Sequence, residues 1–191
     1  MNRFLTFGYG ALSYVIFLAA FLYAIGFVGN LVVPRSIDHG VEASIGEAVA
    51  VNVLLLGLFA VQHSVMARPA FKRWWTRLVP KSIERSTYVL LSSLVLLLMF
   101  WQWRTIPAVI WNVTWPSGRI GLQVLFWLGW ATVLASTFMI NHFDLFGLRQ
   151  VYLAWRAEPC TDTGFRTPCY TESCGTLSCW ASLSRFGPRP R

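Results

Sequence analysis

The sequence has few charged residues, and most of its length contains no cysteine. Of its 191 residues, 13% are charged and 55% are hydrophobic, whereas soluble domains average about 25% charged residues. This composition argues against a soluble globular protein, and the high hydrophobicity excludes an intrinsically disordered chain. All the cysteines lie near the C-terminus, at Cys160, Cys169, Cys174 and Cys179. We therefore expect a small integral membrane protein whose last residues need a separate explanation.

Four apolar stretches are long enough to cross a bilayer. A spanning helix needs about 20 apolar residues, and within lipid the backbone polar groups must bond inside the segment. The stretches are residues 7–29, 45–66, 87–103 and 121–140. The sequence therefore predicts an all-α integral membrane fold, a bundle of four transmembrane helices. This transmembrane domain is expected over residues 1–156, followed by a cytoplasmic segment (157–168) and a disordered or irregular C-terminal tail (169–191).

Basic residues are concentrated between the second and third stretches. The segment 68–85 holds six of them against a single acid, Glu84. Because cytoplasmic loops carry an excess of Lys and Arg, we expect both termini in the cytoplasm and the segment 69–80 along the interface. The net charge of +8 is attributed to this orientation. No nucleic-acid partner is expected, since no recognised nucleic-acid module accompanies the charge.

Polar residues gather near the predicted cytoplasmic ends of the spans. Burying such groups costs several kcal/mol unless they are paired, so they are candidates for a functional site. The sequence places them in three clusters, which are Gln62, His63, Ser64 and Arg68, then Glu84, Arg85 and Tyr88, and then the run 141–150 with His142, Asp144 and Arg149. Each also has a structural interpretation, such as a helix-end hydrogen bond, a surface ion pair or a helix cap. No spacing of Cys and His indicates a metal site.

Three runs within these clusters carry a family resemblance. They are AVQHSVMARPAFKRWW (60–75), IERSTYVL (83–90) and NHFDLFGLRQVYL (141–153). Over about residues 1–168 the chain resembles the bacterial methanethiol S-methyltransferases, membrane proteins related to the NnrU group and, more distantly, to isoprenylcysteine carboxyl methyltransferases. The resemblance implies methyl transfer from S-adenosylmethionine to methanethiol, giving dimethyl sulfide, in the bacterial inner membrane. The implied partners are the lipid bilayer and a small thiol, and the oligomeric state is left open.

The chemistry suggests roles for the polar residues. The thiolate is the nucleophile, so positive or hydrogen-bonding groups near the sulfur would favour its formation. His142 and Arg149 are the candidate catalytic residues, with Asp144 as an orienter of His142. The resemblance implies that Arg166 helps to bind the methyl donor. The remaining candidates form a substrate-binding or structural polar cluster of Gln62, His63, Arg68, Glu84 and Arg85.

The last 23 residues do not continue the family pattern. In the family, the element Arg166–Pro168 precedes a helix with an R-H-P motif that helps to bind the donor. This chain instead reads CYTESCGTLSCWASLSRFGPRPR, which has no apolar periodicity. A one-base shift with permitted synonymous codons can read LLYRIVRHPLMLGFLIAFWATPT from Pro168. The alternative is an authentic, divergent, cysteine-rich cytoplasmic tail, but its cysteine spacings do not match zinc-binding patterns. We therefore interpret 169–191 as an out-of-frame tail and expect the chain as written to have little or no activity.

Two other function classes stay open. One is a non-catalytic, NnrU-like membrane accessory protein linked to denitrification. The other is a basic membrane adaptor without small-molecule chemistry. The run NHFDLFGLRQV (141–151) favours the methyltransferase.

Overall fold

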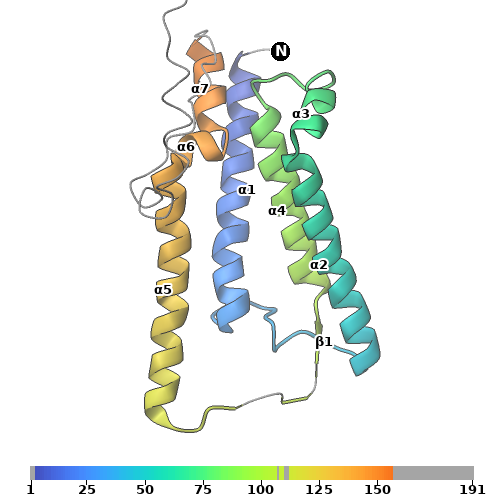
Figure 1. The fold of residues 1–191 in the computed structure, drawn as a ribbon, viewed down its shortest axis with the longest axis vertical. Coiled ribbons are helices and arrows are strands. Elements are labelled where there is room, and N and C mark those ends of the chain that lie inside the picture. Colours follow the sequence, from blue (N-terminus) through green and yellow to red (C-terminus); the bar gives the residue numbers. More distant parts are fainter. Residues whose placement is uncertain (1–2, 107, 110–111, 157–191) are drawn as a thin grey trace, which may run out of the picture.

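The computed structural model describes residues 3–106, 108–109 and 112–156 (Figure 1). This part of the chain is built almost wholly from helices. The elements in chain order are α1 (Arg3–Gly29), β1 (Val41–Glu42), α2 (Ile45–Ala67), α3 (Pro69–Trp75), α4 (Glu84–Gln102), β2 (Arg104–Thr105), α5 (Pro116–Ile140), α6 (His142–Leu145) and α7 (Leu148–Arg156). The segments on which the out-of-frame interpretation and the role of Arg166 rest lie outside the described residues.

The four predicted spans are confirmed as α1, α2, α4 and α5, each long and apolar enough to cross a membrane. Local sequence explains where the spans α2 and α5 and the short helix α3 begin. Ser44 accepts a hydrogen bond from the Glu47 amide and caps α2. Pro69 and Pro116 occupy the first turns of α3 and α5, where a missing N–H costs nothing. Helices α4 and α5 begin some residues earlier than expected. Their first turns are polar, and the prediction followed only the apolar residues.

Three of the spans pack against one another, with α4 between α1 and α2 (Figure 1). Their apolar core lies toward the β1 end of the molecule. It consists of Phe27, Leu55, Met99 and Phe100. The ring of Phe100 stacks on Tyr23 at 5.3 Å. Toward the other end, where α3, α6, α7 and the N-terminus lie (Figure 1), buried hydroxyl groups replace this core.

Small residues let α1, α4 and α7 approach closely at that polar end. Ser13 and Ser86 are completely buried, as is Val151 of α7. A Cβ on Gly10 would lie 2.6 Å from a methyl group of Val151, and a Cβ on Gly147 would lie 2.9 Å from the Ser86 amide nitrogen. Gly147 also has φ +80°, a backbone conformation that other residues rarely adopt. Glycines therefore bring α7 back onto α1 and α4.

A short parallel ladder, which the sequence did not predict, joins β1 to β2. The buried side chain of Asn52 fixes it to α2. The Asn52 amide donates to the Arg104 carbonyl at 2.8 Å, and its oxygen accepts from the Arg104 amide at 3.0 Å. Because both halves of the amide are satisfied, Asn52 can be buried at this end of the spans.

The fourth span, α5, flanks the other three (Figure 1). None of its most apolar window is buried. It meets α1 through aromatic side chains, such as Phe21 against Trp130 at 5.4 Å, and it continues into α6. Most of its apolar surface is therefore uncovered by the described residues.

We predict that Gly10→Ala destabilises the protein, because the added methyl group would collide with buried Val151. Overpacking of this kind costs about 1–3 kcal/mol, measured as a lower midpoint of denaturation in detergent micelles. The matched control is Gly57→Ala, where a Cβ meets nothing within 4 Å and replacing a helical glycine favours the helix. Equal stability of the two variants would contradict close packing of α7 on α1.

Candidate active site

The candidate site is built around His142, at the point where α5 ends. Asn141 adopts a left-handed conformation (φ 86°) that stops α5, and His142 begins α6. The imidazole is 6% exposed. Its Nε2 lies 2.8 Å from the Tyr14 hydroxyl of α1, and its Nδ1 lies 2.9 Å from the Thr137 hydroxyl of α5. Both ring nitrogens are thus satisfied by neutral hydroxyl groups.

Aromatic rings enclose this histidine. Phe138 stacks on it at 4.5 Å, and Phe146 meets it edge-on at 4.7 Å. Phe146 in turn stacks on Phe17 of α1 at 3.9 Å. Burial lowers the pKa of His142 below its ordinary value of 6.5, because removing water disfavours the charged imidazolium. His142 is therefore neutral at pH 7.

Asp144 joins three helices next to His142. Its carboxylate forms an ion pair with Arg85 of α4 at 2.9 Å and lies 3.9 Å from Arg149 of α7. Arg85 also donates to the Asp144 carbonyl at 2.8 Å. Two of the clusters found in the sequence are brought together here. The ion pair connects α4 to α6.

The first cluster meets the second on the α2–α4 side. The Tyr88 hydroxyl lies 2.9 Å from Nδ1 of His63, and Gln62 donates to the Ser92 hydroxyl at 3.3 Å. Phe59 stacks on the His63 ring at 5.3 Å. Of the other predicted site residues, Arg68 is exposed between α2 and α3, and Glu84 is the half-buried first residue of α4. Arg166 lies outside the described residues.

The sequence analysis missed Tyr14 and Thr137. Both lie inside predicted spans. A lone hydroxyl group in an apolar helix is the one sequence feature that could have marked them as site residues. The periodicity of α1 and α5 alone does not show that these two hydroxyls share one imidazole. The role of Asp144 as an orienter of His142 stays a prediction, since the ring contacts described here are made by Tyr14 and Thr137.

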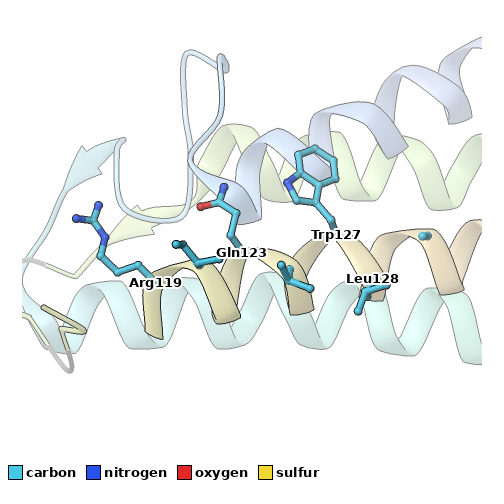
Figure 2. A pocket seen from close by; sticks show the side chains of 7 residues that line it. Arg119, Gln123, Trp127 and Leu128 are labelled. Atoms are coloured by element: carbon cyan, nitrogen blue, oxygen red, sulfur yellow. The ribbon is translucent and has the colours of Figure 1, made fainter. Parts of the chain in front are cut away.

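A surface groove runs along the N-terminal part of α5 (Figure 2). Its lining residues all belong to α5 and are Arg119, Ile120, Gln123, Val124, Trp127, Leu128 and Ala131. They are mostly apolar and come from a single helix face. The groove therefore resembles a lipid-facing surface more than a site for chemistry. Within the described ranges, no group of three or more His, Cys, Asp or Glu residues could hold a metal ion.

These features define an integral membrane protein with a polar layer at one end of its spans and a neutral histidine buried within it. The chain is 71% identical over 166 residues to a methanethiol S-methyltransferase of Mycobacterium tuberculosis, covering 87% of this chain and 68% of the relative. It is 57% identical over 160 residues to methanethiol S-methyltransferase 2 of Bradyrhizobium diazoefficiens, covering 84% and 61%. A more distant likeness is to mouse nurim, 35% identical over 120 residues, covering 58% and 44%.

The chain belongs to the methanethiol S-methyltransferase family. It spans about two thirds or less of the length of these relatives. No family model matches it, and no solved structure matches it either. The names of the relatives imply a methyl donor, and they favour the methyltransferase over the accessory protein suggested by the wider NnrU group.

We predict that the protein loses stability on acidification below pH 6.5 because of His142. Its pKa is lowered in the folded state, so the unfolded chain binds more protons below pH 6.5. The stabilising contribution is complete above that pH and is lost as the pH falls through the folded pKa. Denaturation midpoints in micelles between pH 5 and 8 measure this loss.

His142→Gln is expected to flatten the pH dependence, whatever its effect on stability at pH 7. The control is His39→Gln, since His39 is exposed in the loop after α1. An unchanged slope in His142→Gln would contradict the burial of a neutral imidazole.

Proposed function

We propose that this chain carries the thiol-binding part of a membrane methyltransferase, which transfers a methyl group from S-adenosylmethionine to methanethiol and gives dimethyl sulfide. The observation that carries the proposal is the neutral, buried His142 among hydroxyl groups and aromatic rings, in a chain that is 71% identical to an M. tuberculosis relative bearing that name. An apolar thiol suits such surroundings, because sulfur contacts aromatic rings favourably. The uncharged product can leave into lipid.

Buried polar atoms at the same end of the spans fit a polar methyl donor. Gln62 Oε1, Trp75 Nε1 and Ser86 Oγ have no hydrogen-bond partner among the described residues. Buried polar groups normally find partners, so a ligand bearing amino, carboxylate and hydroxyl groups would satisfy them. Bound S-adenosylmethionine would supply a methyl carbon made electrophilic by its sulfonium.

The ion-pair cluster positions α4, the helix that carries Ser86. The Arg85–Asp144 pair fixes the start of α4 against α6. The close approach of Gly147 to Ser86 fixes the turn before α7 against α4. Aligning two reactants can lower a barrier by about 7–11 kcal/mol. The charged cluster therefore contributes mainly by alignment. Direct roles for Asp144, Arg149 and Arg166 in catalysis or donor binding remain part of this proposal.

The proposed location is the bacterial inner membrane, with both termini in the cytoplasm. The basic segment around α3 lies at the same end of the molecule as the N-terminus and α7 (Figure 1). An excess of Lys and Arg marks the cytoplasmic side, which supports this orientation.

We also propose that residues 169–191 are translated out of frame. The match to the M. tuberculosis relative spans 166 residues and leaves 25 residues of this chain outside it, close to the length of the anomalous tail. The one-base-shifted reading restores an R-H-P motif followed by an apolar run, as the family pattern requires. Sequencing the locus tests this directly, because codons that exclude the shifted reading would end the hypothesis.

The activity is tested by dimethyl sulfide release from bacteria that express the base-restored gene and are supplied with methanethiol. We expect release from the restored gene and little or none from the chain as printed. The vector alone is the control for background methylation. Absence of dimethyl sulfide from well-expressed restored protein would contradict the proposed function.

A measurement of donor binding, combined with a measurement of stability, distinguishes a folded chain that lacks the donor site from a misfolded chain. Purified protein of the printed sequence is expected to bind S-adenosylmethionine at least about tenfold more weakly than the restored protein, measured by calorimetry in micelles. Matching denaturation midpoints would show that both are folded. Tight binding by the printed chain would refute the loss of the donor site.

A further inference from the structure

The hydrogen bonds around His142 determine which ring nitrogen carries the proton. A threonine hydroxyl has a single proton to donate. Thr137 donates it to the Leu134 carbonyl at 2.7 Å, so toward His142 its oxygen can only accept. With that donation, the hydrogen of the 2.9 Å contact belongs to Nδ1 of His142.

The protonation of Nδ1 determines the state of the other ring nitrogen, Nε2. A neutral imidazole has one N–H and one lone pair. With its proton on Nδ1, His142 presents the Nε2 lone pair to Tyr14, whose hydroxyl donates to it at 2.8 Å. The basic nitrogen is thus covered by Tyr14, and the imidazole itself is 6% exposed. A thiol cannot reach Nε2 without displacing the tyrosine.

Tyr14 is the more accessible member of the pair. Its side chain is half-buried and lies beside the stacked rings of Phe17 and Phe146, each 6.1 Å from its own ring. This aromatic wall suits the methyl group and sulfur of a small thiol. The phenolic oxygen can accept a proton from one side while it donates its own to Nε2 on the other.

We propose that Tyr14 and His142 form a two-step proton relay in which the Tyr14 oxygen, rather than the imidazole, meets the thiol. This inference rests on the proposed function. As the S–H bond breaks, its proton passes to Tyr14 Oη and the original Tyr14 proton passes to His142 Nε2. The sulfur electron pair then forms the new C–S bond as the C–S bond of the sulfonium donor breaks. Two neutral thioethers result, and the imidazolium returns its proton to water.

Each neighbouring element contributes to the surroundings of this relay. Tyr14 comes from α1 and Asp144 from α6, with Arg85 of α4 and Arg149 of α7 around the carboxylate. Thr137 of α5 supplies an uncharged acceptor. Thr137 acts through the imidazole and is a positioning residue, because its hydroxyl fixes the tautomer that leaves Nε2 free to accept.

The tautomer is tested on the printed chain, with nitrogen-15-labelled histidine in detergent micelles. Nuclear magnetic resonance at pH 7 is expected to show a neutral His142 with its proton on Nδ1. Thr137→Val should give a mixture of tautomers, and Thr137→Ser should restore the single form. A proton on Nε2, or a charged ring at pH 7, would overturn the relay.

The proton transfer is tested with thiols of different acidity, on whichever form of the chain, printed or base-restored, releases dimethyl sulfide. Tyr14→Phe is expected to lower kcat with methanethiol about 100-fold, the scale of general acid–base catalysis. With the more acidic 2,2,2-trifluoroethanethiol the loss should shrink to a few-fold, because that thiol ionises without help. The control is Tyr23→Phe, since the Tyr23 hydroxyl donates to the Arg35 carbonyl at the other end of α1.

The outcomes separate the two proposals. Equal losses with both thiols would refute the relay and leave the methyltransferase intact, because a purely structural tyrosine does not distinguish thiols by acidity. Failure of the unsubstituted protein to methylate any thiol would refute the proposed function and, with it, the relay. A selective loss with methanethiol supports both.

Discussion

Close contact of α7 with α1, and of the turn before α7 with α4, is the constraint on which the polar end of the molecule depends. The chain leaves α5, turns at Asn141 and must return to α1 within about ten residues. Two glycines permit that return, since Gly10 leaves room for Val151 and Gly147 has a positive φ that other residues rarely adopt. Without it, Tyr14 and His142 would not meet, and Asp144 would not reach Arg85. Close helix packing therefore places the residues of the candidate site, and the ion pairs form only once that packing has brought the charges together.

The two ends of the helix bundle are held together by different kinds of interaction. At the β1 end, aromatic and aliphatic side chains form the core around Phe100, and the buried Asn52 has both halves of its amide paired with Arg104. At the α7 end, buried serines, the buried His142 and an ion pair replace that core. Polar groups inside a membrane are costly unless paired. Their concentration at one end supports placing the proposed chemistry there.

The proposed chemistry depends on a neutral His142, because only the neutral imidazole can accept a proton. Thr137 and Tyr14 satisfy both ring nitrogens without adding charge, and the carboxylate of Asp144 is held by arginines. The imidazole can thus accept a proton at neutral pH, while the nearby charges are balanced within their own cluster. This separation of a neutral acceptor from a charged scaffold suits the activation of a weakly acidic, apolar thiol.

The amino-acid order alone determined the four spans, because twenty apolar residues in lipid have no alternative to a helix. It also determined that polar residues gather near the ends of α2, α4 and α5. Which of them meet was decided only by tertiary structure. Arg85 and Asp144 are separated by 59 residues and Tyr14 and His142 by 128, and helix periodicity carries no information about such distant pairs. The β1–β2 ladder escaped prediction for the same reason, since two residues have no periodicity and depend on Asn52 for their place.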